Sequence, residues 1–359
     1  MKYFLTGISP GKFSRTFILV TLVLLTLVLG LNIVVNPYGL YSTSWLNPVV
    51  WSDRKEKIKL LEDYPDRIEL LIMGSSRMMR IDPRLLGSLA SLECFNLSVN
   101  HARTEDFLAL LRYSVISQGL HLKSVIIGLD INAFRGLYQM DNLLKYYPEL
   151  FHFTSSEKQT FLNEYVTLNW NKFNKGLSFH QLEKSLTALG QLVIHGPWEN
   201  TYNFSSNGMM IYNRLEDNPA PDGSLALEEK LNAAIERYRR EYGGIDRLSE
   251  ERKNYFFQTI EFCRRHGIEL VVVTLPYHPR FFKSLEGSPF TGLNSRWEEF
   301  LTETAGKYGF KLVECQNLES FGGDASSFYD EIHMKQSNSD LLIRYLVREA
   351  GFRGGKDTF

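Results

Sequence analysis

The stretch IELLIMGSSR, residues 68–77, decides the fold class of the chain. Its apolar part, 68–73, stops at a glycine, and this length and stop are typical of a buried strand in a parallel sheet. Similar runs follow at 94–99 (CFNLSV) and 125–131 (VIIGLDI), and the segment between them, 106–117, carries apolar residues at helical spacing. This strand–helix–strand rhythm predicts a parallel α/β sheet.

The same rhythm resumes toward the C-terminus. Residues 247–266 are typical of an amphipathic helix, and residues 268–275 (IELVVVTL) give the strongest strand signal of the chain, ended by Pro276. Further elements are expected in the order helix, strand and helix, at 296–308, 310–313 and 336–350.

Residues 138–244 differ from the rest of the chain. They are rich in Asn, Lys and aromatic residues and show no strand rhythm, so we expect a mostly helical insertion that lies over the active site. The sequence therefore predicts one α/β domain, residues 67–359, that contains this insertion.

An uncharged run of 20 residues, 16–35, precedes the domain. A helix of this length rises about 30 Å, which is enough to cross the hydrocarbon core of a membrane. A cleaved signal peptide is the alternative, but its apolar region is usually only about 7–15 residues long and ends in small residues. Here the run continues into NPYGLY without an A-x-A-like site, so we expect an uncleaved transmembrane helix.

The flanks of this run predict its orientation. Lys2, Lys12 and Arg15 precede it, whereas residues 36–53 contain neither Lys nor Arg. The positive-inside rule then places residues 1–15 in the cytoplasm and the C-terminal domain outside the cell membrane. Residues 36–66 would form a juxtamembrane linker. Within it, an aromatic anchor at the outer interface is expected from Tyr38, Tyr41 and Trp45.

Composition and short motifs exclude several classes of function. The net charge is −1 and the pI about 6.7, so the chain lacks the basic excess that a nucleic-acid partner requires. Cys94, Cys263 and Cys315 lie far apart within or beside apolar runs, which favours buried structural thiols. No CxxC, HExxH, P-loop or EF-hand pattern occurs, so we expect no metal and no cofactor.

The first candidate catalytic segment is Gly74-Ser75-Ser76-Arg77, which lies directly after the first strand. Ligands of open α/β sheets bind outside the carboxyl ends of the strands. A serine on a tight strand-to-helix turn is also close to backbone N–H groups that stabilise developing negative charge. The alternative is that the serine only caps the helix.

A second candidate pair, Asp330 and His333, lies near the C-terminus in the segment YDEIHM. Residues three apart can lie on one face of a turn, where the carboxylate can hold the imidazole Nδ1–H and leave Nε2 to act as a base. The alternative is a helix start with Asp330 as its cap and an exposed histidine.

A serine after the first strand and a D-x-x-H before the last helix together resemble the SGNH/GDSL hydrolase superfamily. The resemblance covers about 68–136 and 250–351. It implies that Ser76 is the nucleophile, with Ser75 in place of the usual Asp, and that Asp330 and His333 complete the triad. G-S-S variants are familiar among membrane-anchored relatives that modify cell-envelope polymers. The rival α/β-hydrolase motif G-x-S-x-G fails at Met78.

The resemblance also implies donors for an oxyanion hole. The glycine of the family's second block is missing from residues 96–101, so the backbone N–H of Asn100 or His101 would donate instead. In the third block, normally G-x-N-D, Asn132 would donate, while Asp130 would brace the loop behind the nucleophile.

Three other residues have two interpretations each. Arg77 and Arg80 flank Ser76 and would either hold an anionic substrate or lie solvated on a helix. His278 follows the strongest strand and would either contact substrate or be an ordinary loop residue.

The complete prediction is a flavodoxin-like three-layer α/β/α domain with one transmembrane helix before it. The resemblance and the topology imply a serine esterase or O-acyltransferase acting on an acylated cell-envelope polysaccharide or related polymer. A transferase would require a membrane O-acyltransferase as partner. The alternative is an inactive domain of the same fold that binds polymer or scaffolds a synthase of envelope polymer.

Overall fold

The computed structural model of the protein describes residues 10–41, 46, 53–64, 67–136, 144, 147–154, 170, 173–174, 176–196, 202–212, 227–245 and 247–352. The chain divides into two compact units. The first combines Met1–Ser52 with Glu157–Asn200, and the second combines Asp53–Ser156 with Thr201–Phe359.

A five-stranded parallel sheet forms the centre of the second unit. Its spatial order is β2-β1-β3-β6-β7. The strands are β2 (Cys94–Asn96), β1 (Leu70–Gly74), β3 (Ser124–Leu129), β6 (Glu269–Thr274) and β7 (Lys311–Glu314). This sheet confirms the predicted parallel α/β class.

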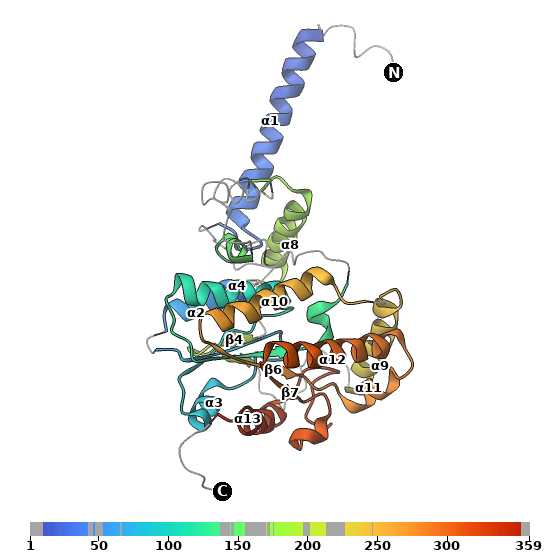
Figure 1. Ribbon diagram of the computed structural model, residues 1–359. Helices are drawn as coiled ribbons and strands as arrows, with labels where there is room; N and C mark the ends of the chain where they lie inside the picture. The colour runs from blue at the N-terminus through green and yellow to red at the C-terminus, as the bar shows by residue number, and fades with distance from the viewer. Residues whose placement is uncertain are drawn as a thin grey trace. The chain divides into compact units, whose positions relative to one another are not determined.

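Helices cover both faces of the sheet, which gives the predicted three layers (Figure 1). Alternate side chains of β1 point to opposite faces: Leu71 packs with α4 (Thr104–Arg112) and α10 (Glu250–Arg265), whereas Leu70 packs with α3 (Pro83–Ala90) and α13 (Gln336–Ala350). The α12 helix (Pro289–Tyr308) adds Trp297 to the first of these cores.

The helix α2 (Asp53–Glu62) belongs to the second unit, although the sequence analysis assigned its residues to a linker. Its charged side chains Asp53, Arg54 and Lys57 are all buried. Arg54 forms a bidentate ion pair with Asp106 of α4, with Nε–Oδ1 and Nη2–Oδ2 distances of 2.8 and 2.9 Å. Charged residues therefore fix this helix to the domain.

The described part of the insertion is mostly helical, as predicted, but it also contains a β-hairpin and is divided between the two units. The second unit holds α6 (Pro148–Phe151), the hairpin of β4 (Tyr202–Phe204) and β5 (Met210–Tyr212), and α9 (Leu227–Tyr242). The first unit holds α8 (Phe179–His195).

The first unit is built on α1 (Pro10–Val35), and α8 packs beside its C-terminal end (Figure 1). Within Gly11–Val35, an 18-residue window has a mean hydropathy of 2.8, and most of the apolar side chains of this helix are exposed. By length and composition, α1 is able to cross a membrane.

Candidate active site

Ser76 lies in the turn that follows β1. In this turn, Met78 N donates to Ser75 O and Met79 N donates to Ser76 O, at 2.9 and 3.3 Å. The preceding residue, Gly74, pairs with Gly128 of β3, and a Cβ there would lie only 2.8 Å from the Cβ of Met78. Because only glycine fits, the turn can close tightly and present Ser76 at the carboxyl edge of the sheet.

The loop that carries Asp330 and His333 is a tight reversal rather than a helix. Tyr329 N donates to His333 O at 2.8 Å, and an antiparallel bridge joins Phe328 to Met334. The helix α13 begins only afterwards, at Gln336. The two residues therefore lie at the tip of a loop held at its base.

The structure brings Ser76, His333 and Asp330 together, although about 250 residues of sequence separate the serine from the other two. Ser76 Oγ lies 2.8 Å from His333 Nε2, and His333 Nδ1 lies 2.7 Å from Asp330 Oδ2. The other carboxylate oxygen, Oδ1, accepts the backbone N–H groups of Ile332 and His333 at 2.9 and 2.8 Å. This is the geometry of a serine, a base and an orienting acid.

The environment keeps Asp330 ionised. Burial alone would raise the pKa of this carboxyl, but the hydrogen bond and charge of His333 and the two backbone N–H groups outweigh burial, so the pKa is lowered. A carboxylate at this position fixes the proton of His333 on Nδ1 and leaves Nε2 free to accept the proton of Ser76.

Arg77 does not face outward as the sequence analysis expected, either as an anion-binding or as a solvated residue. It is buried, and its Nη1 lies 3.1 Å from Asp130 Oδ2. It also donates to Pro276 O, and its guanidinium stacks 4.5 Å from the centre of the Tyr277 ring. Arg77 therefore connects the turn that carries Ser76 to the ends of β3 and β6, and Asp130 lies behind that turn.

Arg80 is also buried rather than solvated. Its guanidinium donates to Tyr329 Oη and Gln336 Oε1, both at 3.1 Å. It lies 5.1 Å from the centre of the Tyr212 ring, which in turn packs edge-on against Tyr329 at 5.4 Å. Arg80 therefore connects the turn that carries Ser76 to the Asp330 loop and to the β4–β5 hairpin.

His278 is buried as well, and its backbone N–H donates to Glu331 O at 3.0 Å. Its ring packs edge-on against Phe328 at 5.5 Å. Burial lowers the pKa of this imidazole. Its contacts thus support the loop of Asp330 and His333, which differs from both interpretations given by the sequence.

The expected oxyanion donors are less favourably placed than the triad. The N–H of Asn100 donates to Asp53 Oδ2 at 2.7 Å, and the N–H of Asn132 donates to Asp130 Oδ1 at 2.8 Å. The side-chain oxygen of Asn132 accepts the hydroxyl of Tyr242 at 2.7 Å. These bonds engage the expected donor of Asn100, its backbone N–H, whereas at Asn132 they involve the backbone N–H and Oδ1 but not Nδ2, the side-chain donor of this residue. His101 is exposed, with a positive φ of 53°.

Sequence reasoning missed the buried side chains that hold the loop after β2. Lys57 Nζ donates to Asn96 O at 2.7 Å and to Gly208 O of the hairpin, and it lies 4.3 Å from the Phe204 ring centre. Burial lowers the pKa of Lys57 to about 7, although the nearby charge of Asp53 acts to raise it. A helix with charges spread around it looks solvated in sequence, so no signal pointed to these contacts.

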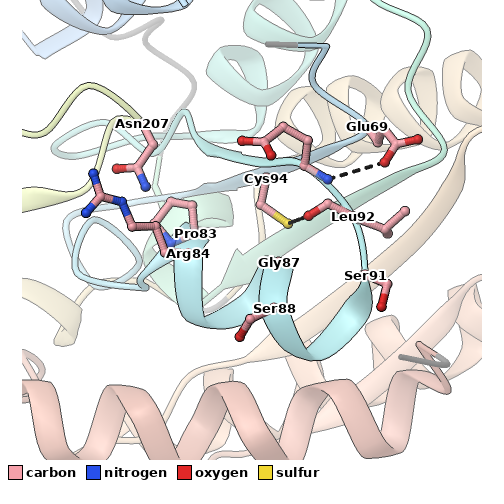
Figure 2. Close-up of a pocket in the computed structure, with 10 residues that line it drawn as sticks. Glu69, Pro83, Arg84, Gly87, Ser88, Ser91, Leu92, Cys94 and Asn207 are labelled. Atoms are coloured by element: carbon pink, nitrogen blue, oxygen red, sulfur yellow. Dashed lines mark hydrogen bonds between the residues drawn. The ribbon is translucent and has the colours of Figure 1, made fainter. Parts of the chain in front are cut away.

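A hollow of about 550 Å³ lies elsewhere on the second unit (Figure 2). Its lining includes Glu69, Arg84, Cys94 and Asn207, so it borders the N-terminal ends of β1 and β2. Ser76 lies at the opposite edge of the sheet. Burial raises the pKa of the Cys94 thiol to about 12, which disfavours the thiolate form that a nucleophilic cysteine needs. Within the described ranges, no three His, Cys, Asp or Glu side chains gather as a metal site requires.

Comparison with known proteins gives distant structural similarities. No protein-family model and no curated protein matches the chain. A solved structure named as a lipolytic protein of the G-D-S-L family from Desulfitobacterium hafniense is 10% identical, with a TM-score of 0.36, covering 79% of this chain and 99% of its own. Another solved structure, named as an acylhydrolase from Bacteroides fragilis, is 10% identical, with a TM-score of 0.37. The match covers 84% of this chain and 95% of that structure's chain.

A third structure, an α/β hydrolase from the metagenome of Lake Arreo in Spain, is 12% identical, with a TM-score of 0.33, covering 79% of this chain and 95% of its own. Similarities of this size carry no argument about activity. The functional conclusion therefore depends on the geometry around Ser76.

Proposed function

We propose that the protein is a membrane-tethered serine esterase or O-acyltransferase that acts on ester groups of a cell-envelope polysaccharide or related polymer. The hydrogen-bonded series of Ser76, His333 and Asp330, with distances of 2.8 and 2.7 Å, carries this proposal. His333 and Asp330 are each more than a quarter exposed at the side chain, so a substrate is able to approach them.

The chemistry follows from these positions. His333 Nε2 takes the proton of Ser76 as Oγ attacks the ester carbonyl, and Asp330 stabilises the imidazolium that forms. The backbone N–H of Ser76 is the proposed donor to the oxyanion. When the tetrahedral intermediate collapses, His333 returns its proton to the leaving alcohol and the acyl group remains on Ser76. Water or a sugar hydroxyl, deprotonated by His333, then accepts the acyl group.

Two features support a polymer substrate. The first is α1, because a domain tethered by this helix on the outer side of the membrane would meet envelope polymers. The second is the pair of half-buried rings of Tyr212 and Tyr329, close to Asp330. Aromatic rings offer the flat apolar surface on which sugar rings bind. For a transferase, a membrane O-acyltransferase that exports the acyl group is the proposed partner.

A specific observation also favours a second candidate, an inactive domain that binds polymer or scaffolds a synthase. The backbone N–H of Asn100 donates to Asp53 and that of Asn132 donates to Asp130, so neither of these two backbone groups is directed at an oxyanion. A fluorophosphonate probe, which phosphonylates activated serines with loss of fluoride, separates the two candidates. We expect labelling of the detergent-solubilised full chain, and a folded wild-type protein that stays unlabelled would support the inactive candidate instead.

A further inference from the structure

Three large aromatic side chains of the first unit are exposed within a short segment. Phe179 is 82% exposed, Trp170 is 61% exposed and Phe173 is 45% exposed. The rings of Trp170 and Phe173 stack with their centres 6.0 Å apart. Large apolar side chains gathered in this way mark a surface that another medium or molecule covers. We call these three residues the aromatic cluster.

Contacts with α1 fix the place of this segment in the first unit. Gly176, between Phe173 and Phe179 in sequence, accepts the Nδ2–H of Asn32 at its carbonyl oxygen at 2.8 Å. A Cβ at Gly176 would lie 2.4 Å from Leu29 Cδ1, so the backbone lies directly against α1. Asn32 is three residues before the last residue of α1, a rise of only about 4.5 Å. The segment therefore lies at the C-terminal end of the apolar helix.

The hydrogen bonds of the Asn32 side chain are those that a polar residue needs in an apolar environment. Asn32 is the most polar residue of the span and is fully buried, and its Oδ1 accepts the hydroxyl of Ser185 at 2.7 Å. Nδ2 and Oδ1 of the Asn32 amide therefore both have hydrogen-bond partners inside the protein, as a polar group within a bilayer requires. The same two bonds hold α8 and the preceding segment to α1.

The chemistry of the segment favours lipid over a second protein. Its sequence, WNKFNKGLSF (170–179), alternates aromatic residues with the two lysines Lys172 and Lys175. Aromatic residues prefer the boundary between headgroups and acyl chains, and lysines nearby favour lipid phosphates. The cluster adds to the exposed apolar side chains of the first unit, because α1 carries many of its own, among them Leu24, which is 57% exposed. By contrast Tyr38, expected to anchor this interface, is only 7% exposed and packs 6.2 Å from the His180 ring.

We propose that Trp170, Phe173 and Phe179 insert into the interfacial region of the membrane leaflet at the C-terminal end of α1. The inference rests on the proposal that α1 spans a membrane. It assigns Trp170, Phe173 and Phe179 to the membrane surface, whereas the sequence analysis expected the insertion that contains them to lie over the active site.

Spin labels on the full chain test this proposal. The native cysteines are all buried, so the wild-type protein gives the background, and single Phe179→Cys and Trp170→Cys variants carry the label. In vesicles of phosphatidylcholine and phosphatidylglycerol, collisions with oxygen report lipid and collisions with a water-soluble nickel chelate report solvent. Leu24→Cys on α1 marks the span, and Ser295→Cys, exposed on α12, marks water.

We expect the ratio of oxygen to nickel collisions at positions 179 and 170 to be several-fold above the ratio at position 295. A water-like ratio at 179 and 170 with a lipid-like ratio at 24 would overturn the interfacial assignment alone. A water-like ratio at 24 as well would overturn the membrane span on which the assignment rests. Low collision rates with both reagents at 179 and 170 would show a protein partner on the cluster and would also overturn the proposal.

Discussion

The ion pair of Arg77 and Asp130 lies directly behind Ser76, and replacing Arg77 by Met tests the role given to it. The two side chains are 1% and 6% exposed, so removal of the guanidinium leaves a carboxylate in the protein interior. Of the described hydrogen bonds to the Asp130 carboxylate, only that from the backbone N–H of Asn132 then remains. Breaking a buried pair in this way costs about 3–5 kcal/mol of unfolding free energy.

Denaturant unfolding of the full chain in mild detergent measures this cost, with Arg264→Met as the matched control. Arg264 and Glu261 form a helical i,i+3 pair whose side chains are 70% and 38% exposed, so its loss should cost about 0.5 kcal/mol or less. The double variant Arg77→Met/Asp130→Asn should recover part of the loss, because no unpaired charge remains.

The activity of the Arg77→Met variant tests the role of Arg77 in a second way. Because Arg77 also holds Pro276 O, its loss should misplace Ser76 relative to His333 and lower kcat more than it changes KM. An unfolding free energy for Arg77→Met within about 1 kcal/mol of the Arg264→Met value would refute the reasoning from buried charge.

Three further predictions concern the triad, the buried lysine and the hairpin. Asp330→Asn should lower kcat on a small aryl ester by about 10⁴ while the fold is retained, because His333 loses the group that fixes its tautomer; an unchanged kcat would exclude Asp330 as the orienting acid. Because the folded-state pKa of Lys57 is lowered to about 7, only the unfolded chain binds that proton between this value and about 10.4, so stability should rise with pH across this window. Lys57→Met should remove that rise, and denaturant titrations at several pH values measure it. Tyr212→Ala should raise KM for a polymeric substrate and leave kinetics on a small aryl ester unchanged, whereas equal effects on both would assign Tyr212 to folding alone.

Local patterns were sufficient to predict the sheet. Runs such as 268–275 are apolar on both faces, and such runs form buried parallel strands wherever helices cover the sheet. The meeting of Ser76 with Asp330 and His333 was expected from the resemblance of their chain order to the SGNH/GDSL layout, and it agrees with the general rule that ligands of open α/β sheets bind outside the carboxyl ends of the strands.

Buried charges were the part that sequence could not predict. Arg77 and Lys57 carry charges that normally remain in water, and only the tertiary partners Asp130, Asn96 and Gly208 make their burial favourable. The engagement of the Asn100 N–H has the same origin, because its partner Asp53 belongs to a helix that looked solvated. Partners separated by about 40 residues or more leave no periodic trace in sequence.

The most direct test of the central claim is fluorophosphonate labelling of the full chain in detergent, with Ser76→Ala and Ser75→Ala compared. The two serines are adjacent and both half-buried, but Ser76 Oγ is the one that is hydrogen-bonded to His333 Nε2. The account predicts that labelling is lost in Ser76→Ala and kept in Ser75→Ala. Labelling that persists in Ser76→Ala, or a folded wild-type protein that takes no label, would contradict it.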